Sequence, residues 1–234
     1  MLEQLKEEVL KANKLLSSEH LAILTWGNVS GFDPEKGLVV IKGSGVEYNI
    51  MESQHLTVLD LGGNVVEGEC NPSTDLDTHL EIYRNFKNVR GIVHTHSTYA
   101  TVWAQMGRAI PCYGTTHADY FKGDIPCTRK ITKEEIGRDY EKNTGKVIVE
   151  TVCGLDPDVM RAVLVRCHGP FVWGNSALDA LHNAVVLENV AKMAFLTDGR
   201  VPGQEPLVDD ELLKKHYNRK FGADAYYGQS GETK

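Results

Sequence analysis

GIVHTH, residues 91–96, is a short apolar run that ends in two histidines separated by one residue. The apolar run predicts a buried strand. Side chains two residues apart on a strand project to the same face, so His94 and His96 would lie about 7 Å apart along that face. Two imidazoles at this spacing can bind one metal ion. Taken alone the pattern is weak, because many proteins contain an H-x-H pair without a metal.

Candidates for further ligands lie elsewhere in the chain. The segment RAVLVRCHG, residues 161–169, predicts a second buried strand, and the glycine and proline that follow His168 would end this strand and expose the imidazole. Asp75 stands at the start of a predicted helix and could supply an oxygen ligand. Three imidazole nitrogens and one carboxylate oxygen suit Zn²⁺, although Mn²⁺ or Ni²⁺ could occupy the same set. His182, in contrast, lies within an apolar helix and is expected to be a packed or hydrogen-bonded side chain of the core.

The rest of the chain alternates between helical and strand-like patterns. Leucines at helical spacing predict an amphipathic first helix, and Thr132 with Glu135 forms a capping box that predicts the start of another. Interleaved elements without a linker or repeat predict a single α/β domain over residues 1–234, while the local pattern leaves the order of the strands open. Predicted strands are 21–26, 38–41, 56–59, 91–96 and 161–169, predicted helices are 2–16, 75–87, 97–107, 132–144 and 176–197, 147–152 is a further apolar run, and a short helical pattern follows 206.

Composition and charge exclude several classes of protein. The chain has 234 residues, 32 acids and 25 bases, and a net charge of −7, which disfavours a nucleic-acid partner because phosphate contacts need clustered bases. Five cysteines without a C-x-x-C pair disfavour a disulfide framework. The N-terminus lacks the apolar region of a signal peptide, and no apolar run approaches the length of about 20 residues that spans a bilayer. We therefore expect a cytoplasmic protein that does not bind membranes.

Three short segments share the chemistry of an anion site. Gly27-Asn28, the run 42–45 (KGSG) and the run 72–74 (PST) each place glycine or a small hydroxyl at a predicted strand end or helix start. Backbone N–H groups and hydroxyls there can bind a phosphate, and Lys42 adds a positive charge. Each segment taken singly is more often an ordinary turn than a ligand site.

Seven motifs occur in order along nearly the whole chain. Together they resemble the L-ribulose-5-phosphate 4-epimerase family of the class II aldolase superfamily. The resemblance implies a three-layer α/β/α fold with a central, mainly antiparallel sheet. The motifs are TWGNVS at 25–30, IKGSGVEY at 41–48, NPSTD at 71–75, GIVHTHS at 91–97, GTTHADYF at 114–121, CHGPFVWG at 167–174 and AYYGQ at 225–229.

The resemblance also implies roles for individual residues. Asp119 and Tyr227 match the acid/base pair of the family, which reaches the metal of a neighbouring subunit in a fourfold-symmetric homotetramer. Gly43 and Thr74 depart from the family, where proline and serine are common, and we expect them to alter loop stiffness without loss of function. The zinc ligands match Asp75, His94, His96 and His168, the phosphate pocket matches Gly27, Asn28, Ser44, Gly45, Ser73 and Thr74 with Lys42 close by, and supporting positions match Thr115, Glu141, His216 and Arg219.

The implied reaction interconverts L-ribulose 5-phosphate and D-xylulose 5-phosphate in arabinose or ascorbate breakdown. The C4 hydrogen is not adjacent to the ketone, so inversion at C4 is expected to proceed by cleavage of the C3–C4 bond and re-addition. Two alternatives stay open. A sugar-phosphate aldolase of the same superfamily would use similar histidines and release its fragments, although a glutamate is expected where this chain has Asp75. A structural protein like the adducin head would lack the histidines.

Overall fold

The computed structural model describes residues 2–198, 208–223 and 225–227. Within these residues, one sheet contains seven strands in the order β4-β3-β2-β1-β5-β7-β6, and every neighbouring pair is antiparallel. The strands are β1 Asn28–Asp33, β2 Leu38–Lys42, β3 Leu56–Asp60, β4 Val65–Glu67, β5 Gly91–His94, β6 Ala162–Val165 and β7 Gly169–Gly174.

Eight α-helices and one 3₁₀ turn accompany the sheet in the described part of the chain. They are α1 Glu3–Ser18, η1 Ser53–His55, α2 Leu76–Asn85, α3 Thr98–Met106, α4 Thr115–Ala118, α5 Lys133–Gly137, α6 Tyr140–Val152, α7 Ala177–Asp198 and α8 Asp210–Phe221. Among these helices, none combines the length and the apolar character that crossing a bilayer requires.

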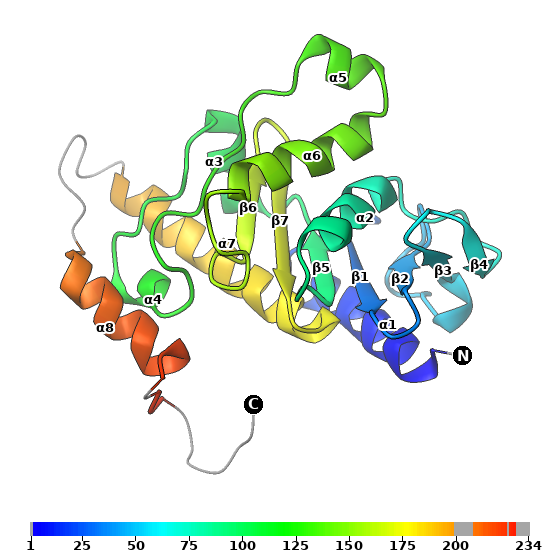
Figure 1. The fold of residues 1–234 in the computed structure, drawn as a ribbon, viewed down its shortest axis with the longest axis horizontal. Helices are drawn as coiled ribbons and strands as arrows, with labels where there is room; N and C mark the ends of the chain where they lie inside the picture. The colour runs from blue at the N-terminus through cyan, green and yellow to red at the C-terminus, as the bar shows by residue number, and fades with distance from the viewer. Residues whose placement is uncertain (1, 199–207, 224, 228–234) are drawn as a thin grey trace.

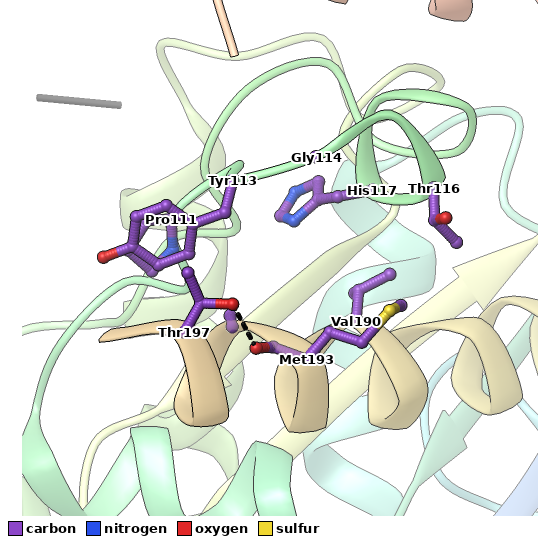
Figure 2. Close-up of a pocket in the computed structure, with 9 residues that line it drawn as sticks. Pro111, Tyr113, Gly114, Thr116, His117, Val190, Met193 and Thr197 are labelled. Atoms are coloured by element: carbon purple, nitrogen blue, oxygen red, sulfur yellow. Dashed lines mark hydrogen bonds between the residues drawn. The ribbon is translucent and has the colours of Figure 1, made fainter. Parts of the chain in front are cut away.

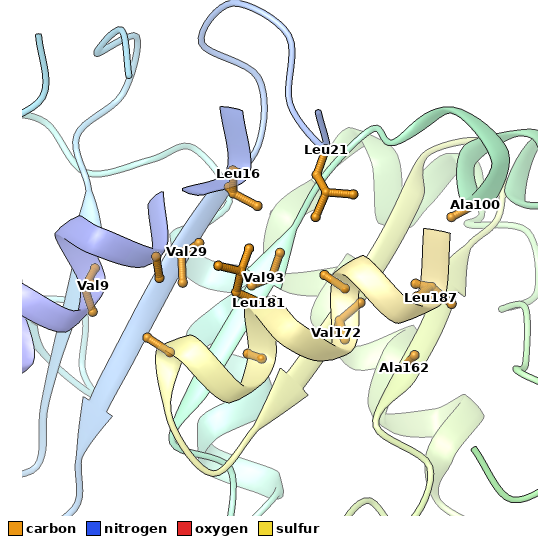
Figure 3. Close-up of a cluster of buried hydrophobic side chains, with 14 of the residues drawn as sticks. Val9, Leu16, Leu21, Val29, Val93, Ala100, Ala162, Val172, Leu181 and Leu187 are labelled. Atoms are coloured by element: carbon orange, nitrogen blue, oxygen red, sulfur yellow. The ribbon is translucent and has the colours of Figure 1, made fainter. Parts of the chain in front are cut away.

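Helices cover both faces of the sheet, which gives the expected three layers (Figure 1). Helices α1, α3 and α7 pack on one face, and α2 and α6 pack on the other. Consecutive strand residues therefore enter different cores: Val93 and Val172 join the α1/α3/α7 core (Figure 3), while Ile92 and Phe171 join the α2/α6 core. Burial of both faces explains why these strands are continuous apolar runs in the sequence.

The predicted strand at 21–26 is wrong. The chain turns there instead, and the first strand begins at Asn28. Leu21 packs in the core, but Leu24 is 74% exposed and has a φ of +56°, which no strand allows. Asn13 of α1 fixes the true strand: its side-chain amide accepts from the backbone N–H of Val29 and donates to the Val29 carbonyl, at 2.8 and 3.0 Å.

The predicted helix 132–144 is two helices. The capping box of Thr132 and Glu135 is confirmed at the start of α5, but the helical conformation is interrupted at Asp139, where φ is +52°. Helix α6 then runs through Gly145 and includes the apolar run 147–152. Gly145 does not end the helix, because its role is close packing: an added Cβ would lie 2.5 Å from Cβ of Glu81 on α2.

Two smaller expectations also fail. The glycine and proline after His168 do not end a strand but begin β7, and His168 lies in the turn that joins β6 to β7. His182 on α7 is exposed rather than packed in the core, and its Nε2 lies 3.4 Å from the hydroxyl of Tyr120.

Candidate functional site

Three histidines converge at one end of β5 and β7. His94 is the last residue of β5, His96 follows two residues later, and His168 lies in the β6–β7 turn. Antiparallel pairing of β5 with β7, in which His94 lies opposite Phe171, brings the turn beside the histidine pair. One ring nitrogen from each histidine lies within 4.8 Å of the others. His96 is beyond the strand end, so the loop after β5, and not strand alternation, directs it toward His94.

The β6–β7 turn is shaped to present His168. Cys167 has a φ of +65°, and its backbone N–H donates to the carbonyl of Ala104 at 2.9 Å. Gly169 follows, and an added Cβ would lie 2.6 Å from the Thr95 carbonyl oxygen and 3.2 Å from the His96 ring. Any larger residue at position 169 would therefore push the two histidine segments apart.

The chemistry of this donor set fits a divalent metal ion. Burial, followed by the charge of His94, lowers the pKa values of His96 and His168, so both imidazoles are neutral at pH 7. Nδ1 of His94 donates to the Pro170 carbonyl at 3.0 Å, which leaves its Nε2 lone pair available. Neutral imidazoles with a free lone pair are the form that binds metals, so the cluster could hold such an ion.

Asp75 lies beside the cluster, at the N-cap of α2. Its Oδ2 accepts from the side-chain amide of Asn28 at 2.7 Å. Burial raises the pKa of Asp75, but the charges of His94, His79 and His168 and the hydrogen bond from Asn28 together outweigh it, and the net pKa is below its ordinary value. The carboxylate is thus ionised in the same pocket as the histidines, outside the tight three-histidine group, and its role as fourth ligand stays a prediction.

A pocket of about 680 Å³ joins the histidines to the predicted anion site. Lys42 at the end of β2 is 2% exposed, and its ammonium lies 3.4 Å from the Thr25 carbonyl and 3.3 Å from the Gly43 carbonyl. No carboxylate among the described residues pairs with it, and burial lowers its pKa. The pocket is lined by all seven predicted phosphate residues, Gly27, Asn28, Lys42, Ser44, Gly45, Ser73 and Thr74, together with Asp75 and the three histidines.

Backbone hydrogen bonds hold the two predicted phosphate loops together. The N–H of Ser44 donates to the Asn71 carbonyl and the N–H of Ser73 donates to the Lys42 carbonyl, each at 2.9 Å. The N–H of Gly43 donates to the His55 carbonyl at 2.9 Å, a bond that proline could not make. Gly43 therefore lacks the rigidity of the proline that is common in the resembled family, but its backbone N–H anchors the loop to the His55 carbonyl.

Asp119 and Tyr227 lie in a second cluster, outside this pocket in the same chain. Asp119 at the end of α4 accepts from His216 Nδ1 at 2.9 Å and from Arg219 Nε at 2.8 Å. Burial raises the pKa of Asp119, but the hydrogen bonds from Arg219 and His216 outweigh it and the net pKa is lowered. Tyr227 is 55% exposed, with the Arg219 guanidinium 5.1 Å and the Lys220 ammonium 4.4 Å from its ring centre.

The other supporting residues divide between the two clusters. Glu141, on α6, lines the histidine pocket, whereas Thr115 lies on α4. Sequence reasoning also missed two aromatic residues that line the pocket. Trp26 lies within the TWGNVS motif and Tyr140 directly precedes Glu141, but neither has a charged or metal-binding group that would have marked it. The Tyr140 hydroxyl lies 3.5 Å from Nδ1 of His168.

A separate cavity of about 210 Å³ lies between α7 and the segment around α4 (Figure 2). Its walls are mainly apolar, and they include Val190 and Met193 of α7. His117 closes one side, and its Nε2 lies 2.9 Å from the Gly123 carbonyl oxygen; because a carbonyl only accepts, Nε2 carries the proton and donates. None of the three clustered histidines lines this cavity, so it is distinct from the site described above.

The α/β/α fold carries a histidine cluster in the same pocket as a buried lysine, and comparison with known families identifies the class of protein. Residues 7–195 match the class II aldolase and adducin N-terminal domain family, and the chain belongs to that family. An L-fuculose 1-phosphate aldolase is 28% identical, with a TM-score of 0.79 over 94% of this chain and 97% of that chain.

Two further solved structures are similar. YgbL from Klebsiella pneumoniae, described as a candidate aldolase, epimerase or decarboxylase, is 26% identical with a TM-score of 0.70, over 91% of this chain and 97% of that one. An L-fuculose-1-phosphate aldolase from Thermus thermophilus shares the fold at 23% identity and a TM-score of 0.67, over 86% of this chain and 97% of that one. The superfamily thus includes sugar-phosphate aldolases and epimerases.

Proposed function

We propose that the protein is a zinc-dependent L-ribulose-5-phosphate 4-epimerase that interconverts L-ribulose 5-phosphate and D-xylulose 5-phosphate. One observation carries the proposal: three imidazoles that could hold a metal share a pocket with Lys42, a buried cation without a carboxylate partner among the described residues. The oxygen-rich end of a sugar phosphate would suit a metal ion held by the histidines, and its phosphate would suit Lys42. Carbohydrate metabolism in the cytoplasm, with arabinose or ascorbate breakdown as the pathway, is part of the same proposal.

The phosphate end explains how cleaved fragments could stay bound. Lys42 and the hydroxyls of Ser44, Ser73 and Thr74 would hold the phosphate of glycolaldehyde phosphate after the C3–C4 bond breaks. Asn28 Oδ1, which is buried and has no hydrogen-bond partner among the described residues, could accept from a substrate hydroxyl. A divalent ion held by His94, His96 and His168, with Asp75 as fourth ligand, would act as a Lewis acid at the C2 and C3 oxygens.

Asp119 and Tyr227 would perform the proton transfers. One group takes the proton from the C4 hydroxyl, the C3–C4 electron pair passes to the C2–C3 fragment as its enediolate, and C4 becomes an aldehyde. After the aldehyde turns over, the enediolate re-adds to its other face and the second group returns a proton to the new C4 oxygen. Opposite faces require two groups, and Asp119 and Tyr227, held by Arg219 and Lys220, would supply them.

We further propose a homotetramer in which neighbouring subunits complete each site. Asp119 and Tyr227 do not line the histidine pocket of their own chain, so a second copy would have to present them. The loop that leads to Trp26 exposes Ile23 and Leu24 by 60% and 74%. Large apolar side chains beside an incomplete pocket are typical of a subunit interface.

The second candidate function is a sugar-phosphate aldolase that releases its fragments. The similarity to an L-fuculose 1-phosphate aldolase favours it. The adducin-like structural alternative has less support, because it predicts missing histidines and this chain has all three.

A coupled assay for D-xylulose 5-phosphate formed from L-ribulose 5-phosphate tests the proposal. We expect product formation that a chelator abolishes and added Zn²⁺ restores. Stoichiometric accumulation of free dihydroxyacetone without D-xylulose 5-phosphate would identify an aldolase instead. A preparation that stays inert after zinc is restored would revive the structural alternative.

A further inference from the structure

Trp26 differs from the other two tryptophans of the chain. Trp103 and Trp173 are at most 1% exposed, whereas Trp26 is 51% exposed and lines the histidine pocket. Its ring centre lies 6.3 Å from that of His96, with the planes tilted by 47°. It immediately precedes Gly27 and Asn28 of the predicted phosphate site. A large aromatic ring thus lines the same pocket as the histidine cluster and the predicted anion loops.

The backbone that carries this ring is held firmly. The Tyr48 hydroxyl, which is buried, lies 2.7 Å from the Trp26 carbonyl and 2.9 Å from the Gly27 carbonyl. Gly27 has a φ of +78°, and an added Cβ would lie 2.8 Å from the His94 carbonyl oxygen. The loop therefore packs directly on the backbone of His94, at the end of β5. A half-exposed indole on such a fixed backbone is positioned by the fold and is not a loose surface residue.

A second aromatic ring flanks the cluster. The Tyr140 ring centre lies 6.4 Å from that of His168, at an interplanar angle of 25°. Trp26 thus lies beside one histidine of the cluster and Tyr140 beside another. The remaining pocket walls are mostly hydroxyls, glycines and charged groups. Among the described residues that line the pocket, these two carry the large aromatic rings, apart from the histidines, on which the carbon chain of a sugar phosphate could pack.

We propose that Trp26 determines which reaction the site performs, by holding the aldehyde fragment in the pocket between bond cleavage and re-addition. This inference rests on the proposed epimerase function. An epimerase must let the aldehyde turn over while it stays bound by its phosphate. An apolar ring face excludes water and blocks exit, but it makes no directional hydrogen bond that would have to break during rotation. A polar wall at this position would bind one orientation of the aldehyde in preference to the other.

Trp26→Ala and Trp26→Phe test the proposal, with Val66→Ala as a control for truncation of an exposed apolar residue far from the pocket, on β4. Metal-loaded enzyme is given L-ribulose 5-phosphate, and free dihydroxyacetone and D-xylulose 5-phosphate are both quantified. We expect the ratio of released fragment to epimerised product to rise about tenfold in Trp26→Ala, which corresponds to about 1.4 kcal/mol, and to stay near the wild-type value in Trp26→Phe and Val66→Ala. A lower rate in Trp26→Ala with an unchanged ratio would overturn the proposal.

Fluorescence gives a second readout that does not depend on turnover. Because Trp26 is the half-exposed tryptophan, L-ribulose 5-phosphate should change the emission of the wild type, and Trp26→Phe should lose that change. Emission that does not respond in metal-loaded wild type at saturating substrate would overturn the placement of Trp26 against the sugar. If the wild type makes no D-xylulose 5-phosphate, the proposed function fails, and the fluorescence response still decides whether Trp26 contacts a bound sugar phosphate.

Discussion

His96 is the most accessible member of the histidine cluster. It is exposed, whereas His94 is buried and His168 is intermediate. His94 also has a carbonyl partner and a stacked ring, Phe171, at 4.2 Å between centres. Removal of His96 should therefore delete one ligand without disturbing the core.

His96→Asn should lose metal and activity together. Two imidazoles hold a divalent ion much more weakly than three, so purified variant should contain little zinc by elemental analysis while its circular dichroism stays native. His20→Asn is the matched control, because His20 is exposed and has a φ of +56°, a conformation that asparagine tolerates. Full zinc occupancy in His96→Asn would contradict the ligand assignment.

Asp119→Asn and Tyr227→Phe should each lower kcat by about 10²–10⁴-fold, the usual contribution of a general acid or base. Both changes keep the side-chain shape, and neither residue lines the histidine pocket of its own chain, so zinc content should stay at the wild-type level. Steady-state kinetics and metal analysis on the same preparations measure kcat and zinc content for each variant. Wild-type rates in both variants would remove these residues from the mechanism.

At the scale of elements, the packing of α6 on α2 depends on a glycine. An added Cβ at Gly145 would lie 2.5 Å from Glu81 Cβ and 3.1 Å from the Thr78 carbonyl oxygen. The Thr78 hydroxyl also donates to the Glu141 carbonyl at 2.6 Å, which ties α2 to the start of α6. Because Asp75 begins α2 and Tyr140 begins α6, this contact sets the distance between two walls of the pocket.

Gly145→Ala should lower the free energy of unfolding by about 1–3 kcal/mol, the usual cost of overpacking. Gly137→Ala is the control: it lies on α5 with open space around an added Cβ, and should be neutral or stabilising by up to about 1 kcal/mol. Urea unfolding of the two variants measures the difference. Equal stability of Gly145→Ala and the wild type would show that α2 and α6 can separate without cost.

Much of the element pattern could be predicted from sequence, because local burial determines it. The strands 38–41 and 56–59 and the helix that begins after Asp75 are confirmed, since their apolar residues do enter the core. The run 21–26 misled because Leu24 faces solvent, a result of the turn after α1 that no local pattern encodes. The break at Asp139, where φ is +52°, is likewise not marked by the local pattern.

The residues of the site also divide into those that the local sequence predicts and those whose contribution depends on the folded structure. The pocket does gather the predicted ligands and phosphate residues, since their motifs lie at strand ends and loops that the sheet brings together. The roles of Asp119 and Tyr227 stay predictions, because the chain places them in a separate cluster. Trp26 and Tyr140 could not be found from sequence, since their contribution comes from position alone.

For the whole molecule, His117 should contribute to sensitivity to acid. Burial lowers its pKa to about 4, although the Gly123 carbonyl and Asp124 oppose this. In the unfolded chain a histidine titrates near pH 6.5, so folding favours the neutral form. Stability from this group is fully present above about pH 6.5 and falls as pH drops toward 4, by about 3 kcal/mol in all.

His117→Gln should remove that dependence. Glutamine keeps a donor for the Gly123 carbonyl but does not titrate, so the slope of unfolding free energy against pH between about 6.5 and 4 should be shallower than in the wild type. Urea unfolding at several pH values measures both slopes. Parallel slopes would mean that His117 stays exposed to protonation in the folded protein.

The strand order has a consequence for synthesis on the ribosome. Strands β1 to β4 pair in consecutive order along the chain, so this four-stranded meander can form as soon as residue 67 has emerged. Strand β5 can then join β1, but its other edge stays open until β7 arrives some eighty residues later. Until then a nascent chain presents an apolar strand edge that ends in two histidines, which favours aggregation. The third histidine and the strand that protects this edge emerge almost together, so the chain completes its three-histidine cluster only when the sheet can close.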